Sequence, residues 1–190
     1  MDLVLWLLAR SSGTGSAVAL ELALLSGMAL RTGALGWLTH NRGVRVLHDS
    51  ASILWLPLAI VHVVALLLDP TARINVTDLV VPFGVPYGTI AIGLGTISAQ
   101  LLGIVMVSTW LRPRIPNRTW VVLHRLSYPA FVAVVAHSLL AGTDLSQPLV
   151  AGLAWITVVA LAAVGITRVL RPERDPRSRA GTRTASVELR

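Results

Sequence analysis

The stretch HDSASILWLPLAIVH, residues 48–62, places one histidine at each end of thirteen mostly apolar residues. The chain around it is strongly hydrophobic, because 54% of its 190 residues are hydrophobic and the mean hydropathy is +0.72. Soluble domains of this length have a more even composition. We therefore interpret residues 48–62 as part of a membrane-spanning helix that carries two ionisable groups into the bilayer.

Charge and cysteine content limit the possible functions. Charged residues make up 13% of the chain and lie between long apolar runs, as expected where spans alternate with aqueous loops. The absence of cysteine excludes thiolate metal sites, iron–sulfur clusters, disulfides and cysteine nucleophiles. The position of the arginines in loops explains the high isoelectric point, so we expect membrane lipid rather than nucleic acid as a partner.

The apolar runs predict an all-α membrane protein with one domain, residues 14–170, because each run is near the roughly 20 residues that cross a bilayer core. The five expected spans are residues 14–35, 48–68, 87–110, 120–141 and 148–170. The segment 1–13, which Arg10 interrupts, is too short to cross and is predicted to lie at the membrane interface, where Trp6 suits the boundary. Residues 171–190 carry six arginines against three acidic residues and are predicted to form a disordered basic tail.

The distribution of arginines predicts the orientation of the spans. Arginines are frequent after the first, third and fifth expected spans, whereas the loop 69–86 carries one arginine against two aspartates. By the positive-inside rule, the N-terminus lies outside and the C-terminus lies in the cytoplasm. We expect a multi-pass protein of a bacterial cell membrane, in which spans two and four both run outward.

Four of the five histidines fall in these two spans and form two levels. His48 and His124 are expected near the inner side, and His62 and His137 near the outer side. The separations of 14 and 13 residues correspond to about 21 and 19.5 Å of helix rise, which is most of a bilayer core. His40 lies in a loop without a partner at its level. The pattern predicts two sites, one in each leaflet.

Two facing imidazoles without a carboxylate or thiolate nearby suit a six-coordinate b-type haem, whose iron takes one nitrogen from each side. Zinc would require further ligands. The helical phase favours the second span, because 14 residues end about 40° from whole turns while 13 residues end about 140° short. Pro129 lies between His124 and His137, and we expect it to kink the helix and bring His137 round.

The histidine spacing, together with WVVLHRLSY (residues 120–128) and AGTD (residues 141–144), resembles the ferric reductase-like transmembrane domain. Ferric reductases, NADPH oxidases and the haem subunit MsrQ share this domain. The likeness covers nearly the whole chain, from LLARSSG to the end of the fifth expected span. It implies two haem b groups, with His48 and His124 on the inner iron and His62 and His137 on the outer iron.

The resemblance also sets expectations about partners. Enzymes of this family continue into a cytosolic flavin and nicotinamide domain, whereas about twenty polar residues follow the fifth expected span here. GLGT, residues 93–96, is interpreted as helix packing between small residues. We therefore expect no flavin or NAD(P) site in this chain, which resembles an MsrQ-type haem subunit fed by an electron-donor partner or by quinol, with quinone as a further cofactor. Arg125 and Arg10 are expected to bind haem propionates.

The predicted function is transmembrane electron transfer from a cytoplasmic or quinol donor to an outer acceptor. The acceptor is left open between ferric iron, oxygen and an outer-side reductase partner. Trp55, Trp120 and Tyr128 line the haem faces or an electron route, or else pack as ordinary interface and core residues. Two other functions remain: a small transporter or proton-conducting helical bundle with titrating histidines, and a haem-free assembly subunit.

Overall fold

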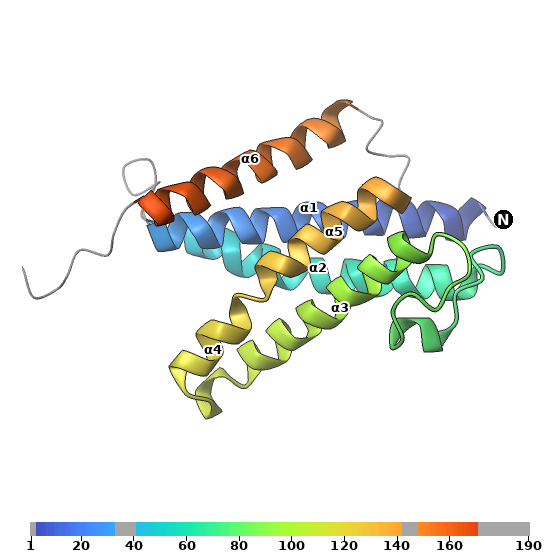
Figure 1. Ribbon diagram of the computed structural model, residues 1–190, viewed down its shortest axis with the longest axis horizontal. Helices are drawn as coiled ribbons and strands as arrows, with labels where there is room; N and C mark the ends of the chain where they lie inside the picture. Colours follow the sequence, from blue (N-terminus) through green and yellow to red (C-terminus); the bar gives the residue numbers. More distant parts are fainter. Residues whose placement is uncertain (1–2, 33–40, 142–147, 171–190) are drawn as a thin grey trace, which may run out of the picture.

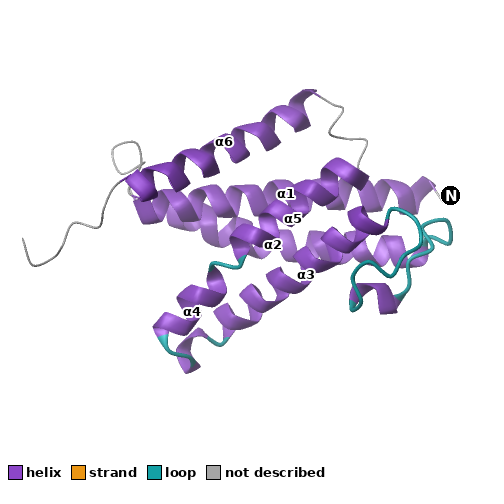
Figure 2. Ribbon diagram, in the orientation of Figure 1, coloured by secondary structure: helices purple, strands orange, loops and turns teal. Residues whose placement is uncertain are grey.

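The computed structural model describes residues 3–32, 41–141 and 148–170, and within these residues it is helical without strands (Figures 1 and 2). The expected all-α fold is confirmed. The elements in chain order are α1 (Leu3–Thr32), α2 (Asn41–Leu68), η1 (Val76–Leu79), α3 (Thr89–Trp110), η2 (Arg112–Arg114), α4 (Asn117–His124), α5 (Ser127–Ala141) and α6 (Pro148–Leu170).

The helices form two packed pairs. α1 and α2 lie antiparallel and contact each other along their length, and α3 packs against α5 (Figure 1). α5 and α6 also contact α1, which joins the pairs into one bundle. The four helices that carry the histidines or face them therefore lie next to one another.

Length and composition agree with a multi-pass membrane protein. Among the described residues, the stretches long and apolar enough to cross a bilayer are Leu3–Leu30, Arg42–Leu68, Thr89–Trp110 and Asn117–Ala141. α6 occupies the fifth expected span with 23 residues.

Two helices begin earlier than expected. α1 starts at Leu3 rather than near residue 14, because Arg10 does not interrupt it: the guanidinium lies 4.6 Å from the ring centroid of Trp6, one turn away. α2 starts at Asn41, so His48 lies two turns inside the helix rather than at its end. The interfacial position of residues 1–13 stays a prediction, and the tail 171–190 lies outside the described residues.

The fourth expected span is two helices. α4 ends at His124 and α5 begins at Ser127, and Pro129 lies in the first turn of α5. Proline has no N–H to donate to the carbonyl four residues earlier, which here belongs to Arg125. That carbonyl accepts from Tyr128 N instead, at 3.1 Å. The expected kink is therefore present, and it lies just before the proline.

The core lies between the two histidine levels. Trp55, midway between His48 and His62 on α2, and Phe131, between His124 and His137, are both buried. They belong to one cluster with residues of α1 and α3, namely Ala19, Leu20, Leu24 and Leu102, and with Ala130 of α5. The middle of the bundle is thus filled by apolar side chains.

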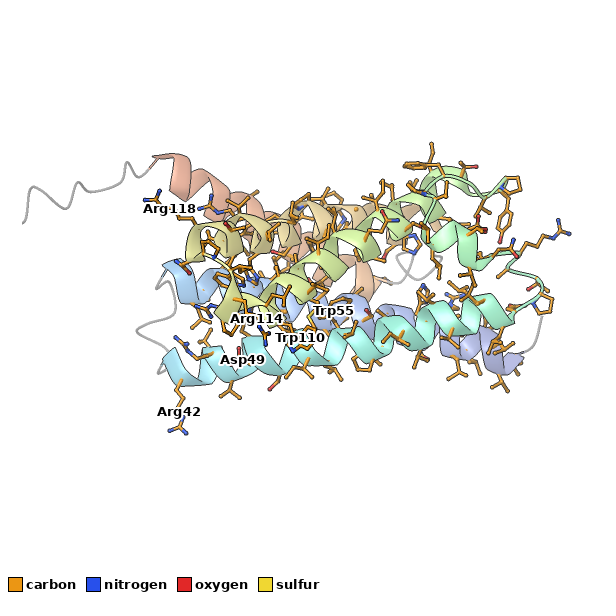
Figure 3. The ribbon with its side chains drawn as sticks, turned by 90° about the horizontal axis from the view of Figure 1, so that it is seen from below. Arg42, Asp49, Trp55, Trp110, Arg114 and Arg118 are labelled. Carbon is orange, nitrogen blue, oxygen red and sulfur yellow. The ribbon has the colours of Figure 1, made fainter. Side chains whose placement is uncertain are left out.

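The arginines that begin two of the spans lie at one end of the bundle. Figure 3 shows Arg42 of α2 and Arg118 of α4 at the same end, opposite to the end where α1 begins in Figure 1. This arrangement fits the alternation of spans on which the orientation argument depends. Which end faces the cytoplasm stays a prediction.

Candidate functional site: two histidine pairs

The structure brings the four span histidines together in two pairs. The ring centroids of His48 and His124 are 6.4 Å apart with 72° between the ring planes. Those of His62 and His137 are also 6.4 Å apart, with 79° between the planes. The break between α4 and α5 thus lets a spacing of 13 residues present both imidazoles to α2 in almost the same way.

Three of the four imidazoles are anchored by the same kind of hydrogen bond. In each case Nδ1 lies 2.7 Å from the carbonyl oxygen of a buried alanine, the pairs being His62 with Ala9, His48 with Ala23 and His137 with Ala91. A carbonyl oxygen can only accept, so Nδ1 carries the proton and donates it. The other ring nitrogen, Nε2, is left as a free lone pair in these three residues.

A glycine stands four residues after each of these alanines. In an α-helix the carbonyl of residue i already accepts the N–H of residue i+4, so the side chain of that later residue lies beside the carbonyl. A Cβ added at Gly13, Gly27 or Gly95 would lie 2.7, 3.0 or 2.8 Å from the nearest ring atom of the facing histidine. We call each Ala-x3-Gly segment with its histidine a cup, because only glycine leaves room for the ring.

The two cups of α1 form an internal repeat. LARSSG, residues 8–13, and LALLSG, residues 22–27, share the pattern L-A-x-x-S-G at a distance of 14 residues, which is also the spacing of His48 and His62 on the antiparallel α2. The serines bond within the helix, Ser12 Oγ to Leu8 O and Ser26 Oγ to Leu22 O. Our reading of the sequence missed this repeat, although the equal spacing in two neighbouring helices was a usable signal.

The third cup corrects our interpretation of the glycines on α3. Gly95 is not a general helix-packing residue but the residue that admits His137, while Gly93 of the same GLGT sequence contacts Phe83. Both are close-contact positions, so the small side chains matter as expected. Their partners are one imidazole and one loop phenylalanine rather than another helix backbone.

His124 has no cup. Its Nδ1 is buried and has no hydrogen-bond partner among the described residues. The residue of α3 that lies 14 positions after Ala91 is Val105, whose carbonyl already accepts from Ser108 Oγ at 2.9 Å and from Thr109 Oγ1 at 2.8 Å. Threonine, not glycine, stands four residues later, so the α3 side of this pair offers neither space nor a free acceptor.

Aromatic stacking supports His124 instead. Its ring stacks on Trp120, with centroids 4.8 Å apart and 22° between the planes. The guanidinium of Arg112 lies 4.2 Å from the Trp120 ring centroid, an arrangement in which the cation interacts with the indole ring. Trp120 was a candidate from the sequence, whereas Arg112 had been counted only for orientation.

The other predicted residues lie less close to the pairs. Arg10 follows Ala9 on α1 and is therefore near the His62 level, with its guanidinium over Trp6. Arg125 follows His124 as the C-cap of α4, and its side chain is exposed. Tyr128 is half-buried and packs on the core cluster. No cluster of three or more histidine, aspartate or glutamate side chains suited to a metal ion occurs in the described part of the chain.

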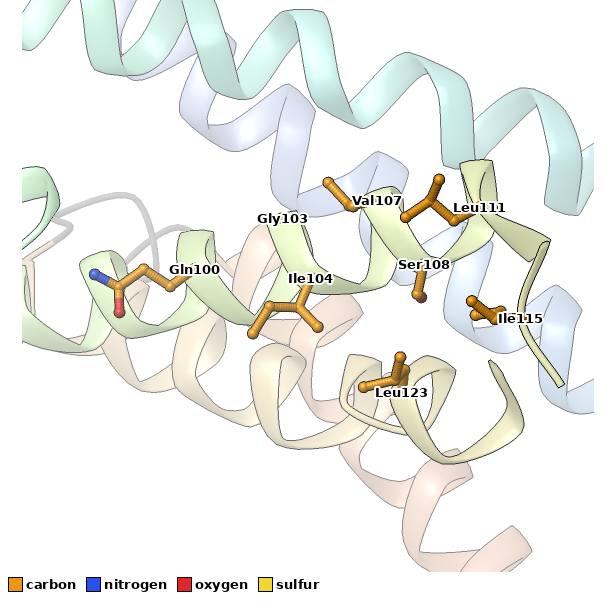
Figure 4. A pocket seen from close by; sticks show the side chains of 8 residues that line it. All are labelled: Gln100, Gly103, Ile104, Val107, Ser108, Leu111, Ile115 and Leu123. Atoms are coloured by element: carbon orange, nitrogen blue, oxygen red, sulfur yellow. The ribbon is translucent and has the colours of Figure 1, made fainter. Parts of the chain in front are cut away.

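A shallow groove on α3 is separate from the histidines. It is lined by Gln100, Gly103, Ile104, Val107, Ser108, Leu111, Ile115 and Leu123 (Figure 4). Its walls are almost entirely aliphatic and contain none of the four paired histidines. The groove therefore does not extend the candidate site.

Residues 12–135 match the sequence model of a protein family described as ferric reductase like transmembrane component. The match includes three of the four paired histidines and ends just before His137. Searches of curated proteins and of solved structures found no match to this chain.

Replacing Gly95 with alanine should displace His137, because the new Cβ would stand 2.8 Å from Nδ1. Losing that hydrogen bond leaves a buried donor unsatisfied, at a cost of about 1–3 kcal/mol. The matched control is Gly103→Ala on the same helix, where a Cβ meets nothing within 4 Å. We expect a lower thermal midpoint in detergent and an altered ¹⁵N shift of His137 Nδ1 for Gly95→Ala only. Equal behaviour of both variants would contradict the cup.

Proposed function

Because the chain belongs to the ferric reductase-like transmembrane family, we propose that it carries electrons across the membrane through two b-type haems. His48 and His124 would hold one iron, and His62 and His137 the other. The observation that carries this proposal is the 6.4 Å separation of the imidazole centroids, which is the same in both pairs.

The separation fits one metal ion between two imidazoles. Because a metal–imidazole bond is about 2.0–2.1 Å long and the ring centroid lies roughly 1.1 Å beyond the nitrogen, two rings on opposite sides of one ion have centroids about 6.3 Å apart. Two imidazoles in direct hydrogen-bond contact or in van der Waals stacking would not require this spacing at both levels. The repeated value therefore supports a common ligand geometry.

The hydrogen bonds support the same role. A metal-binding histidine usually donates its second ring N–H to a carbonyl or carboxylate, which fixes the ring and makes the free nitrogen a stronger donor to the metal. His48, His62 and His137 donate from Nδ1 to backbone carbonyls. With only two imidazoles at each level of the described residues, the donor set suits the two axial positions of haem better than a four-coordinate zinc.

The bound haems would supply one-electron chemistry, while the protein positions them and excludes water. The α1 cups hold His62 and His48 at the same spacing at which α2 presents them. Trp55 and Phe131 fill the space between the levels, so the route between the two sites is apolar and aromatic. Arg10 and Arg125, next to Ala9 and His124 in the chain, are the proposed partners of the propionates.

The proposed direction is from a cytoplasmic or quinol donor at the His48–His124 level to an acceptor at the His62–His137 level. The arginines at the ends of α2 and α4 support it through the positive-inside rule. A proton-conducting bundle is less well supported, because histidines that give their Nδ1 proton to a helix carbonyl are held in one tautomer.

Purified protein should show the Soret and alpha bands of low-spin haem b, with about two haems per chain. The nearly perpendicular imidazole planes predict a strongly anisotropic low-spin ferric EPR signal at both sites. His48→Ala or His124→Ala should remove one haem signal, and His62→Ala or His137→Ala the other. Each double variant within a pair should add little, since one axial ligand is already lost.

His40→Ala is the control, because the fifth histidine is outside both pairs, and it should retain both signals. A colourless protein from haem-replete cells would contradict the proposal. Loss of the same signal in His48→Ala and His137→Ala would contradict the pairing.

The unequal support of the two pairs predicts unequal potentials. His124 lacks the carbonyl bond that strengthens an imidazole as a donor, and Arg112 places a positive charge on the Trp120 ring stacked against it. Both effects favour ferrous iron, so the His48–His124 haem should have the higher midpoint potential. The expected difference is on the order of a tenfold change in the one-electron equilibrium constant, about 59 mV.

Spectroelectrochemical titration would assign each potential in the pair variants. Arg112→Gln should lower only the inner potential, and Arg114→Gln, in the same short η2 helix, is the control. Equal potentials in the unaltered protein would contradict this assignment while leaving the two-haem proposal intact.

A further inference from the structure

The connection between α2 and α3 differs from an ordinary aqueous loop. It begins at Asp69, whose carboxylate accepts hydrogen bonds from the hydroxyl and N–H of Thr71, which lower the pKa of Asp69. It then passes through η1 and returns to α3 at Gly88 (Figure 2). Our sequence analysis placed residues 69–86 outside the membrane, but several contacts hold the middle of this segment against α3.

Two side chains of α3 bind carbonyls of the connection. Gln100 Nε2 lies 2.9 Å from Val80 O and 3.2 Å from Leu79 O, and Thr96 Oγ1 donates to Asp78 O at 3.0 Å. Gln100 is near the middle of α3, roughly 16 Å along the helix axis from Thr89. It is also further along α3 than Gly95, which contacts His137. The segment therefore follows α3 past the level of the outer pair.

Phe83 fixes the return of the segment. A Cβ at Gly93 would overlap Phe83 Cδ1, so the phenylalanine ring occupies the space that the glycine leaves. Phe83 adopts φ +66°, a left-handed conformation that residues other than glycine rarely take. Gly93 and Gly95 are about 200° apart around the helix, so Phe83 packs on the side of α3 that faces away from His137.

The polar backbone groups of the segment are largely satisfied without water. Val80 N and Val81 N donate to Thr77 O, and Asp78 N donates to Asn75 O. Asn75 N donates in turn to the carboxylate of Asp78. The carbonyls of residues 78–80 are those bound by Thr96 and Gln100. Non-helical backbone tolerates a membrane environment only where its N–H and C=O groups find such partners.

The outward-facing side chains of the segment are apolar. Val76, Val80 and Val81 are 68%, 70% and 59% exposed. They continue the exposed aliphatic surface that α3 presents at Ile90 and Val107. Between Ile74 and Gly88 the only charged residue is Asp78, and its carboxylate is bonded within the segment.

From these contacts we propose that Val76–Phe83 is a re-entrant segment in the leaflet that contains His62 and His137. Its valines lie against lipid acyl chains, and Gln100 holds it to the outer face of α3. Lipid is the occupant that fits, because the surface is aliphatic, continuous with a membrane span, and backed by carbonyls that are already bonded. This proposal does not depend on the proposed haems.

The absence of cysteine makes the test direct, since single cysteines can be introduced into the natural chain and spin-labelled. Val80→Cys and Val81→Cys are compared in lipid vesicles with Val107→Cys as the lipid reference and Arg73→Cys as the aqueous reference. Accessibility to oxygen and to a water-soluble nickel chelate is measured by EPR. Labels at Val80 and Val81 should resemble Val107, with high oxygen and low nickel accessibility.

High nickel accessibility, as at Arg73, would overturn the proposal in favour of an aqueous loop. Low accessibility to both reagents would overturn it in favour of a protein surface, such as a second copy of the chain.

The role of Gln100 is tested by Gln100→Leu in the Val80→Cys background. The control is Ala99→Leu, which introduces the same side chain at the neighbouring exposed position of α3. Gln100→Leu should increase label mobility and nickel accessibility several-fold, whereas Ala99→Leu should leave both unchanged. An unchanged label in Gln100→Leu, or an equal change in both variants, would remove Gln100 from the proposal. Circular dichroism verifies that each variant is folded.

Discussion

A carbonyl inside an α-helix already accepts one N–H, and a second donor reaches it only where the residue four positions later has no side chain. The paired histidines depend on this constraint. Three imidazoles, buried in an apolar bundle, need an acceptor for Nδ1, because an unsatisfied polar group inside a membrane is costly. Ala9, Ala23 and Ala91 supply the carbonyls, and a glycine four residues after each supplies the space.

The same constraint sets the distance between the two levels. α1 and α2 are antiparallel, so their contacts match only if the cups on one helix repeat at the spacing of the histidines on the other. Both spacings are 14 residues. On the opposite side of the bundle, α3 has one cup and α5 follows a broken helix. The hydroxyls of Ser108 and Thr109 occupy the Val105 carbonyl, which leaves His124 to rest on Trp120.

Much of the fold and of the site was predictable from the sequence, and the rest depends on tertiary contacts. The long apolar runs identified the helices, and alternation of spans matched the histidines by depth. The start of α1 was wrong because a run broken by Arg10 reads as an end, whereas the structure places that guanidinium over Trp6. The Ala-x3-Gly segments resemble ordinary small-residue packing until a facing histidine is known. Similarly, hydropathy does not record that Arg112 lies on Trp120 or which carbonyls Gln100 binds.

The cups also bear on how fast electrons would move. A ligand that swings or changes its bonding when the iron changes oxidation state adds a reorganisation energy to every transfer. Imidazoles whose Nδ1 is tied to a helix carbonyl, and whose ring is confined to the space of one missing Cβ, have little freedom to do so. In such a bundle the rate of transfer is governed by the separation of the two centres and by the packing of Trp55 and Phe131 between them, rather than by motion of the ligands.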